Sequence, residues 1–121
     1  MQIQIQARDF PLTETLVDYV ERNINFVLRS RYEQIRRIAV HLSVVRDSRE
    51  RVNKRCQIQI SLPRLQDIKI DESERDLYVA IERAIHRAGR TVNRRLKRHF
   101  FKKRKLFVPH KARSILLLGS Q

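Results

Sequence analysis

Hydrophobic and polar residues alternate with a period of two in four segments of the chain, and this pattern predicts four β-strands. Residues 2–7, QIQIQA, place Ile3, Ile5 and Ala7 on one face of the first strand. The alternation recurs in segments 36–45 and 54–62 and in a shorter fourth segment. Their inward positions are Ile38, Val40, Leu42 and Val44, then Cys56, Ile58, Ile60 and Leu62, and finally Ile68 and Ile70.

Two other segments repeat their hydrophobic residues at the spacing of an α-helix. Residues 13–30 show this spacing directly after Thr13, whose hydroxyl is a suitable N-cap. The second helix is expected to begin within DESERD, where Ser73 and Asp76 are spaced almost as a capping box. It is predicted to run from about residue 75 to beyond residue 98.

The predicted order is therefore β-α-β-β-β-α, an α+β fold. The first two strands should be parallel and joined by a right-handed crossover, and strands two to four should form an antiparallel meander. Both helices should pack on the one apolar face of the four-stranded sheet, an arrangement similar to that of double-stranded-RNA-binding domains. With 121 residues, the chain is expected to form one domain over residues 1–105, followed by a C-terminal tail over residues 106–121.

Charge is distributed very unevenly along the chain. Residues 1–82 hold 14 Lys or Arg and all 13 acidic residues, a net of +1. Residues 83–121 hold 13 Lys or Arg and no acid, so almost all of the net charge of +14 lies in the last third. A region this electropositive indicates a polyanionic partner, of which nucleic acid is the first candidate and an anionic membrane the second.

The charge of the last helix falls on one side of it. On a wheel of about 100° per residue, a basic row lies within roughly 60° of Arg83, opposite an apolar stripe centred about 150° away. Only Arg95 falls on the apolar side, which requires the helix to have passed the edge of the sheet by then. Arginine predominates, and its planar guanidinium suits phosphate. The row consists of Arg83, Arg87, Arg90, Arg94, Lys97 and Arg98.

The sequence RHFFKKRKLF after this row mixes three phenylalanines, Phe100, Phe101 and Phe107, with Lys and Arg. The rings would stack on unpaired bases, lie on a membrane surface or complete the core, and the sequence does not choose among these. Lys102 joins the candidate RNA contacts. The apolar SILLLG of the tail would pack on the domain, contact a protein partner or remain free.

Residue usage argues against an enzyme. The four His and one Cys lack the spacing of metal ligands, and His41 is expected on the face of its strand opposite the buried row. Two glycines cannot form a phosphate-binding Gly-rich loop. No cofactor and no small-molecule substrate are implied. A cluster of acids is interpreted as capping the last helix rather than as catalytic: Asp71, Glu72, Glu74 and Asp76.

Cysteine usage and hydropathy indicate a soluble cytoplasmic protein. Cys56 has no cysteine with which to form an internal disulfide. The first residues lack the basic and apolar regions of a signal peptide, and the longest apolar run, ILLL at 115–118, is far too short to span a membrane.

Two stretches, MQIQIQARDFPLTETLVDYVE and DLYVAIERAIHRAGRTVNRRLKRH, carry a family resemblance. The first is similar to the first strand and the Thr-Glu-x-Leu helix opening of the ribosome hibernation-promoting factors. These are also called ribosome-associated inhibitors or sigma-54 modulation proteins. The second is similar to the start of that family's last helix with the basic run behind it. The resemblance covers residues 1 to about 100. The tail is too short for the long form's dimerisation domain, so the chain is expected to be the short form.

The resemblance implies a protein that docks on the small ribosomal subunit, in the path of tRNA and mRNA, and inhibits translation or stabilises inactive ribosomes. Such proteins contact 16S RNA through basic side chains of both helices, and the row identified above falls at matching positions. Where the family usually carries lysines in its first helix, this chain has Asn23 and Phe26. The candidate contacts there are Arg22, Arg29 and Arg31.

Two alternatives to this interpretation stay open at the level of the sequence. One is a more general module for structured RNA, because RNA helices are recognised largely through phosphates, 2′-hydroxyls and shape. The other is a protein-interaction role, either in modulating a transcription factor or at a membrane surface through the aromatic and basic stretch.

Overall fold

The computed structural model describes residues 1–107, with the backbone alone described for residues 101–107. Its order of elements confirms the predicted β-α-β-β-β-α arrangement, with a short 3₁₀-helix, η1, added after the first helix. The elements are β1 (Gln2–Ala7), α1 (Glu14–Leu28), η1 (Arg29–Gln34), β2 (Arg37–Arg46), β3 (Val52–Ser61), β4 (Ile68–Glu74) and α2 (Leu77–Phe107).

The four strands form one mixed sheet in the order β1-β2-β3-β4. β1 pairs with β2 in parallel, and the pairs β2–β3 and β3–β4 are antiparallel, as predicted. The register aligns apolar side chains across all four strands: Ile5 lies beside Val40, which lies beside Ile58, which lies beside Ile70. Because side chains alternate between faces, such rows make one face of the sheet continuously apolar.

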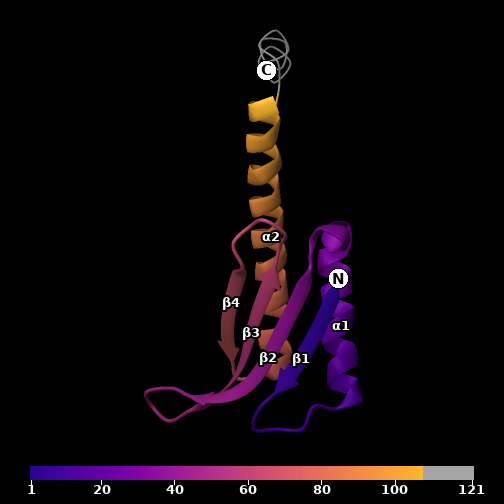
Figure 1. Cartoon of the computed structure of the whole chain (residues 1–121). Coiled ribbons are helices and arrows are strands. Elements are labelled where there is room, and N and C mark those ends of the chain that lie inside the picture. Colours follow the sequence, from indigo (N-terminus) through magenta and orange to yellow (C-terminus); the bar gives the residue numbers. More distant parts are fainter. Residues whose placement is uncertain (108–121) are drawn as a thin grey trace.

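Both helices cover this apolar face, and the opposite face is left open (Figure 1). α1 begins as predicted at Thr13, whose Oγ1 accepts a hydrogen bond of 3.2 Å from the amide of Leu16. The helices contribute to the core Leu16, Val20, Ile24 and Leu28 from α1 and Ile81, Ala84, Ile85, Ala88, Val92 and Leu96 from α2.

The start of α2 was predicted wrongly. β4 continues through Glu74, so Ser73 is a strand residue and not an N-cap. The helix begins at Leu77, and Asp76 supplies the cap because its Oδ1 accepts a hydrogen bond of 2.8 Å from the amide of Tyr78. The alternation of Ile68 and Ile70 continues in the polar residues that follow, and pairing with β3 keeps them in the sheet.

α2 continues beyond residue 98, as predicted. Leu96 is the last buried residue of its apolar stripe within residues 77–100, and the helix continues to Phe107 and protrudes past the end of the sheet (Figure 1). The proposed division of the chain at residues 105 and 106 stays a prediction. The described part of the chain contains no helix that is both long and apolar enough to cross a membrane.

α1 and α2 run parallel to each other and pack tightly at Gly89 (Figure 1). A Cβ atom on this residue would lie 2.5 Å from Cγ1 of Val27, far inside van der Waals contact. Gly89 is buried in the middle of a helix, where glycine is otherwise unfavourable by about 1 kcal/mol relative to alanine. The close packing of the two helices therefore accounts for this glycine.

This contact predicts that substitutions at Val27 and Gly89 have non-additive effects on the free energy of unfolding. Gly89→Ala should lower the free energy of unfolding by about 1–3 kcal/mol, despite the better helix propensity of alanine, because the β-branched Val27 cannot easily turn away. In a Val27→Ala background the same substitution should be neutral or stabilising. Urea unfolding of the two single variants and the double variant measures this, and equal effects in both backgrounds would contradict the packing described.

Candidate nucleic-acid interface

The structure places the predicted basic row on the exposed side of α2, opposite its buried stripe. Its six members are all exposed, whereas the residues of the opposite stripe are buried. The arginine and lysine side chains thus project from a helix whose other side is fixed in the core. The exposed members are Arg83, Arg87, Arg90, Arg94, Lys97 and Arg98.

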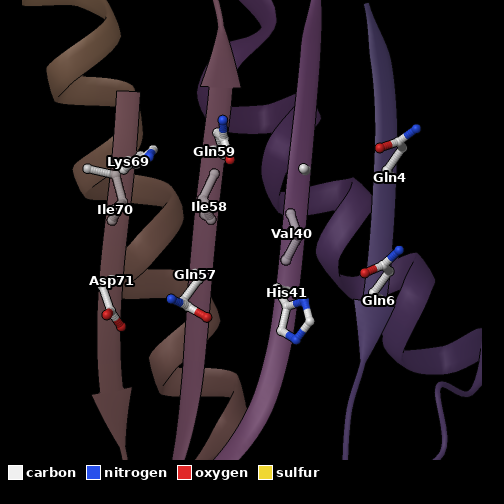
Figure 2. Close-up of a pocket in the computed structure, with 11 residues that line it drawn as sticks. Gln4, Gln6, Val40, His41, Gln57, Ile58, Gln59, Lys69, Ile70 and Asp71 are labelled. Atoms are coloured by element: carbon white, nitrogen blue, oxygen red, sulfur yellow. The ribbon is translucent and has the colours of Figure 1, made fainter. Parts of the chain in front are cut away.

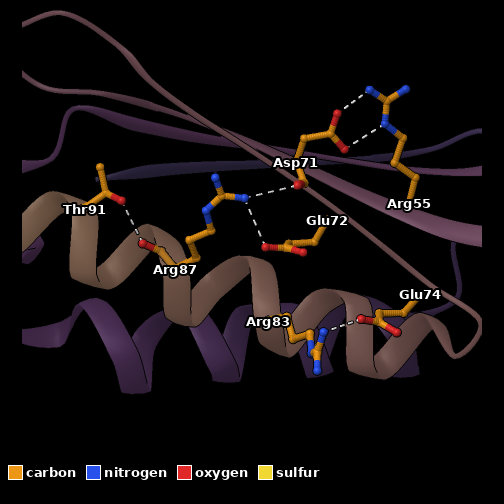
Figure 3. Close-up of polar contacts among 7 residues, drawn as sticks. All are labelled: Arg55, Asp71, Glu72, Glu74, Arg83, Arg87 and Thr91. Atoms are coloured by element: carbon orange, nitrogen blue, oxygen red, sulfur yellow. Dashed lines mark hydrogen bonds and ion pairs between the residues drawn. The ribbon is translucent and has the colours of Figure 1, made fainter.

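The first two arginines of this row are held by acids at the edge of the sheet. Nη1 of Arg83 lies 2.6 Å from Oε1 of Glu74, and Nη1 of Arg87 lies 3.1 Å from Oε1 of Glu72 (Figure 3). Arg87 also donates to the backbone oxygen of Asp71, at 3.4 Å. About half or more of each arginine side chain stays exposed, so these are surface ion pairs of modest strength.

These contacts correct the interpretation of the acidic cluster as helix caps. Glu72 and Glu74 follow Ile68 and Ile70 at intervals of two, so they lie on the helix-covered side of β4, where α2 passes. The period of two, carried past the last isoleucine, was the signal that could have revealed them. Of the four acids, Asp76 alone caps the helix.

The remaining acid of the cluster, Asp71, lies on the open side of the sheet. Asp71 forms an ion pair with Arg55 of β3 (Figure 3), including a hydrogen bond of 2.8 Å from Nε. The hydrogen bond from Arg55 lowers the pKa of Asp71 below its usual value. This pair braces the β3–β4 edge and does not extend the basic row.

The later members of the row have no such partners. Arg90, Arg94, Lys97 and Arg98 form no ion pair with any side chain within residues 1–100. They follow one another over about two turns of helix, at a rise of about 1.5 Å per residue. The strongest uncompensated positive charge among the described side chains therefore lies from Arg90 onward, toward the protruding end of α2.

Arg95 was predicted to need a helix already past the sheet, and the structure shows a different solution. It is half-buried, and its Nη1 donates a hydrogen bond of 3.2 Å to the backbone oxygen of Gln66 in the β3–β4 loop. A long side chain can bury its stem while its charged end reaches a carbonyl. Arg95 thus anchors the helix to the loop and is not part of the exposed row.

Of the three arginines expected in the first helix, Arg22 alone lies in α1, and Arg29 and Arg31 lie in η1. Arg22 and Arg29 are exposed. The Nε of Arg31 donates to Oδ1 of Asn93 at 2.9 Å. Because this hydrogen bond joins Arg31 to α2, α1 and η1 together offer two unengaged candidate arginines rather than three.

Near the start of α2, polar and aromatic contacts also join it to α1. The hydroxyl of Tyr19 donates a hydrogen bond to Glu82, and its ring packs edge-on against Tyr78 with centroids 4.7 Å apart. Burial, reinforced by this hydrogen bond and the charge of Glu82, raises the pKa of Tyr19 to about 12. Tyr19 therefore remains a protonated donor across the neutral pH range.

Some of the candidate RNA-contacting residues come after residue 100. Their side chains lie outside the described part of the structure. Lys102, Phe101 and Phe107 belong to α2 by their backbone alone. Phe100 is half-exposed and its ring lies at a tilt beside that of His99. The choice among stacking, membrane contact and core completion stays a prediction for this stretch.

The open face of the sheet is the second surface with recognisable chemistry. It carries a shallow depression of about 520 Å³ lined by side chains that include Gln4, Gln6, Gln57 and Gln59 (Figure 2). His41 lies there too, on the face opposite the buried row as predicted. The charged residues that line it, Lys69 and Asp71, have opposite signs, so this surface contrasts with the basic side of α2.

The described residues hold no cluster of metal ligands, and Cys56 is a buried free thiol. Within the described part of the chain, no three His, Cys, Asp or Glu side chains gather as possible metal ligands. Cys56 is fully buried, and burial, followed by the charges of Asp71 and Glu72, raises the pKa of its thiol to about 12. A thiol with so high a pKa is a poor nucleophile.

Comparison with known proteins gives a consistent result. A family model described as sigma 54 modulation protein / S30EA ribosomal protein matches residues 3–99. No curated protein matches the chain.

Two solved structures have the same fold. The N-terminal domain of Protein Y from Thermus thermophilus is 30% identical in sequence, with a TM-score of 0.60, and the match covers 77% of this chain and 93% of that one. A ribosomal subunit interface protein from Coxiella burnetii is 15% identical, with a TM-score of 0.67, covering 80% of this chain and 99% of that one.

The ion pairs with β4 predict that Arg83 and Arg87 are less available to bind a polyanion. Glu72→Gln combined with Glu74→Gln should raise the salt concentration at which the protein elutes from heparin, because Arg83 and Arg87 are then released. The free energy of unfolding should fall by less than about 1 kcal/mol for each ion pair removed.

The matched control for this experiment removes two acids that form no ion pair within residues 1–100, Asp18→Asn and Glu33→Gln. It makes the same change in net charge on exposed positions of α1 and η1. Elution of both double variants at the same salt concentration would show that heparin affinity depends on net charge alone. The two ion pairs would then not reduce the binding of Arg83 and Arg87 to a polyanion.

Proposed function

The chain belongs to the sigma 54 modulation protein / S30EA ribosomal protein family, and from this premise we propose that it binds the small ribosomal subunit through the outward side of α2. Family membership confirms the resemblance predicted from the sequence. In the proposal, the bound protein occupies the path of tRNA and mRNA, and it thereby inhibits translation or keeps ribosomes inactive.

The observation that carries the proposal is the uncompensated half of the basic row. Arg90, Arg94, Lys97 and Arg98 are exposed and have no ion partner within residues 1–100. Like charges one turn apart destabilise an isolated helix by a few tenths of a kcal/mol per pair. A row of this kind is stabilised when a polyanion lies along it, and guanidinium groups can grip phosphates with two hydrogen bonds each.

The rigid attachment of α2 to the core makes its basic row suitable for binding a structured RNA. The opposite side of α2 is buried in the core through residue Leu96, so the arginines that face outward are held at fixed spacing before any partner arrives. Groups fixed in advance lose little conformational entropy on binding. Folded RNA, whose phosphates are also fixed, is the polyanion that benefits most from such a surface.

A second RNA-facing contribution comes from α1 and η1. Arg22 of α1 and Arg29 of η1 are exposed, as the row of α2 is, and would add two basic contacts to it. The open face of the sheet carries glutamines in place of such a row. The proposal therefore assigns the ribosome to the helix side of the molecule and binding, not catalysis, to the protein.

Sedimentation with ribosomes tests this proposal. The protein should co-sediment with the small subunit at physiological salt and should lower the output of a cell-free translation reaction. Arg90→Glu combined with Arg94→Glu should weaken binding by more than about 100-fold and abolish the inhibition, because two charge-assisted contacts become repulsive.

A charge-matched control separates the helix side from total charge. Arg49→Glu with Arg51→Glu reverses two exposed charges in the β2–β3 hairpin, away from α2, and should leave binding near wild type. Absence of sedimentation by the wild-type protein would refute the proposal. Equal affinity for free duplex RNA and for the small subunit would instead favour a general RNA-binding module.

A further inference from the structure

We infer that Phe26 is a stacking surface for an unpaired RNA base at the seam between α1 and α2, an inference that rests on the function proposed above. Phe26 is 84% exposed, whereas the other exposed large hydrophobic side chains of the described part are each less than half exposed. A phenylalanine in water contributes nothing to the core. The fold therefore gives no reason for this ring.

The position of Phe26 follows from the contacts on either side of it. It lies seven residues after Tyr19, close to two full turns, so it is on nearly the same side of α1 as the tyrosine that reaches Glu82. Its neighbour Val27 packs tightly against α2 at Gly89. Phe26 thus lies at the outer rim of the seam between the two parallel helices.

The same contacts give the position of the Phe26 ring along the axis of α2. Tyr19 meets α2 at Tyr78 and Glu82, and Val27 meets it at Gly89. Phe26 is one residue before Val27, so it is level with the turn of α2 that ends at Arg90. This is where the arginine row loses its acidic partners.

Exposed basic residues flank Phe26 along the chain. Arg22 is one turn before it on α1, and Arg29, the first residue of η1, follows three residues after it; both are exposed. On α2, the exposed Arg90 is one residue after Gly89, which lies close to Val27. An exposed aromatic ring with flanking arginines is a combination that binds unpaired nucleotides, because the ring stacks on a base while the cations hold the flanking phosphates.

The same surroundings argue against a protein partner at this position. Exposed apolar patches that dock proteins are contiguous, with several hydrophobic side chains in contact. Here the exposed residues that flank Phe26 along the chain are Arg22, Asn25 and Arg29. A single ring among cations offers little apolar area to a protein but a full face to a base.

Substitutions at this position test the inference on the complete chain. Phe26→Ala and Phe26→Leu should each weaken binding to the small subunit about tenfold, the effect expected for one stacked base. The dependence of affinity on salt should be unchanged, because the same phosphates remain bound. Phe26→Trp should retain the affinity of the wild type, and circular dichroism should show the native fold in all three variants.

The tryptophan variant also provides a direct probe, since the chain contains no other tryptophan. Its fluorescence should be quenched when the small subunit is added. A tryptophan placed at another exposed apolar position, Val52→Trp in the β2–β3 hairpin region, should show no change.

The outcomes separate this inference from the proposed function. If Phe26→Ala binds as tightly as the wild type, the inference is overturned while ribosome binding stands. Full affinity of Phe26→Leu combined with weak binding of Phe26→Ala would indicate an apolar contact with a ribosomal protein, which also overturns it. Failure of the wild-type protein to bind at all would be failure of the proposed function itself.

Discussion

Burial of one side of α2 against the sheet is the interaction on which the rest of the structure depends. Each of the large side chains buried there, such as Ile81, Ile85 and Val92, contributes about 1.5–3 kcal/mol. A surface ion pair such as that of Arg83 contributes about 0–1 kcal/mol. Core packing therefore fixes the position of the helix, and the ion pairs with β4 only adjust how much charge is available on its outer side. The glycine at 89 adds to this rigidity by letting α1 lie close against α2.

The charges on the outer side are graded along the helix because acids occupy only the last two inward positions of β4, after Ile68 and Ile70. β4 carries its acids on the helix-covered side only as far as Glu72 and Glu74, so they reach the first two arginines of the row and no further. From Arg90 onward the helix has no acidic partner among the described side chains and soon leaves the sheet. A protein that merely needed a soluble surface would mix the two signs along the whole helix. This chain compensates its charge where the helix joins the sheet and leaves the protruding half positive.

Most of the fold could be predicted from the sequence, because alternation and helical spacing report directly on which side of each element is buried. The α2 row was predictable for the same reason, and so was the cap at Thr13. The errors came from contacts between elements distant in sequence. Glu72 and Glu74 resemble helix-capping acids when read beside α2, although the period of two carried past Ile70 points to the strand, and the pairing of β4 with β3 places them in the sheet. The carbonyl that accepts from Arg95 is likewise supplied by a loop 29 residues away. Phe26 lies outside the helical stripe of buried residues in α1, so its exposure follows from the sequence, whereas its level along α2 depends on how the two helices pack.

The salt dependence of binding tests the division of the basic row most directly. The logarithm of the affinity for the small subunit should fall steeply with the logarithm of the salt concentration, with a slope of several units. Replacing Arg90 and Arg94 by Gln should reduce that slope by about two units, one for each phosphate that is no longer neutralised. Replacing Arg83 and Arg87 by Gln should reduce it by less than about one unit, because β4 already holds these side chains. Equal reductions for the two pairs, or a slope near zero for the wild-type protein, would contradict the account.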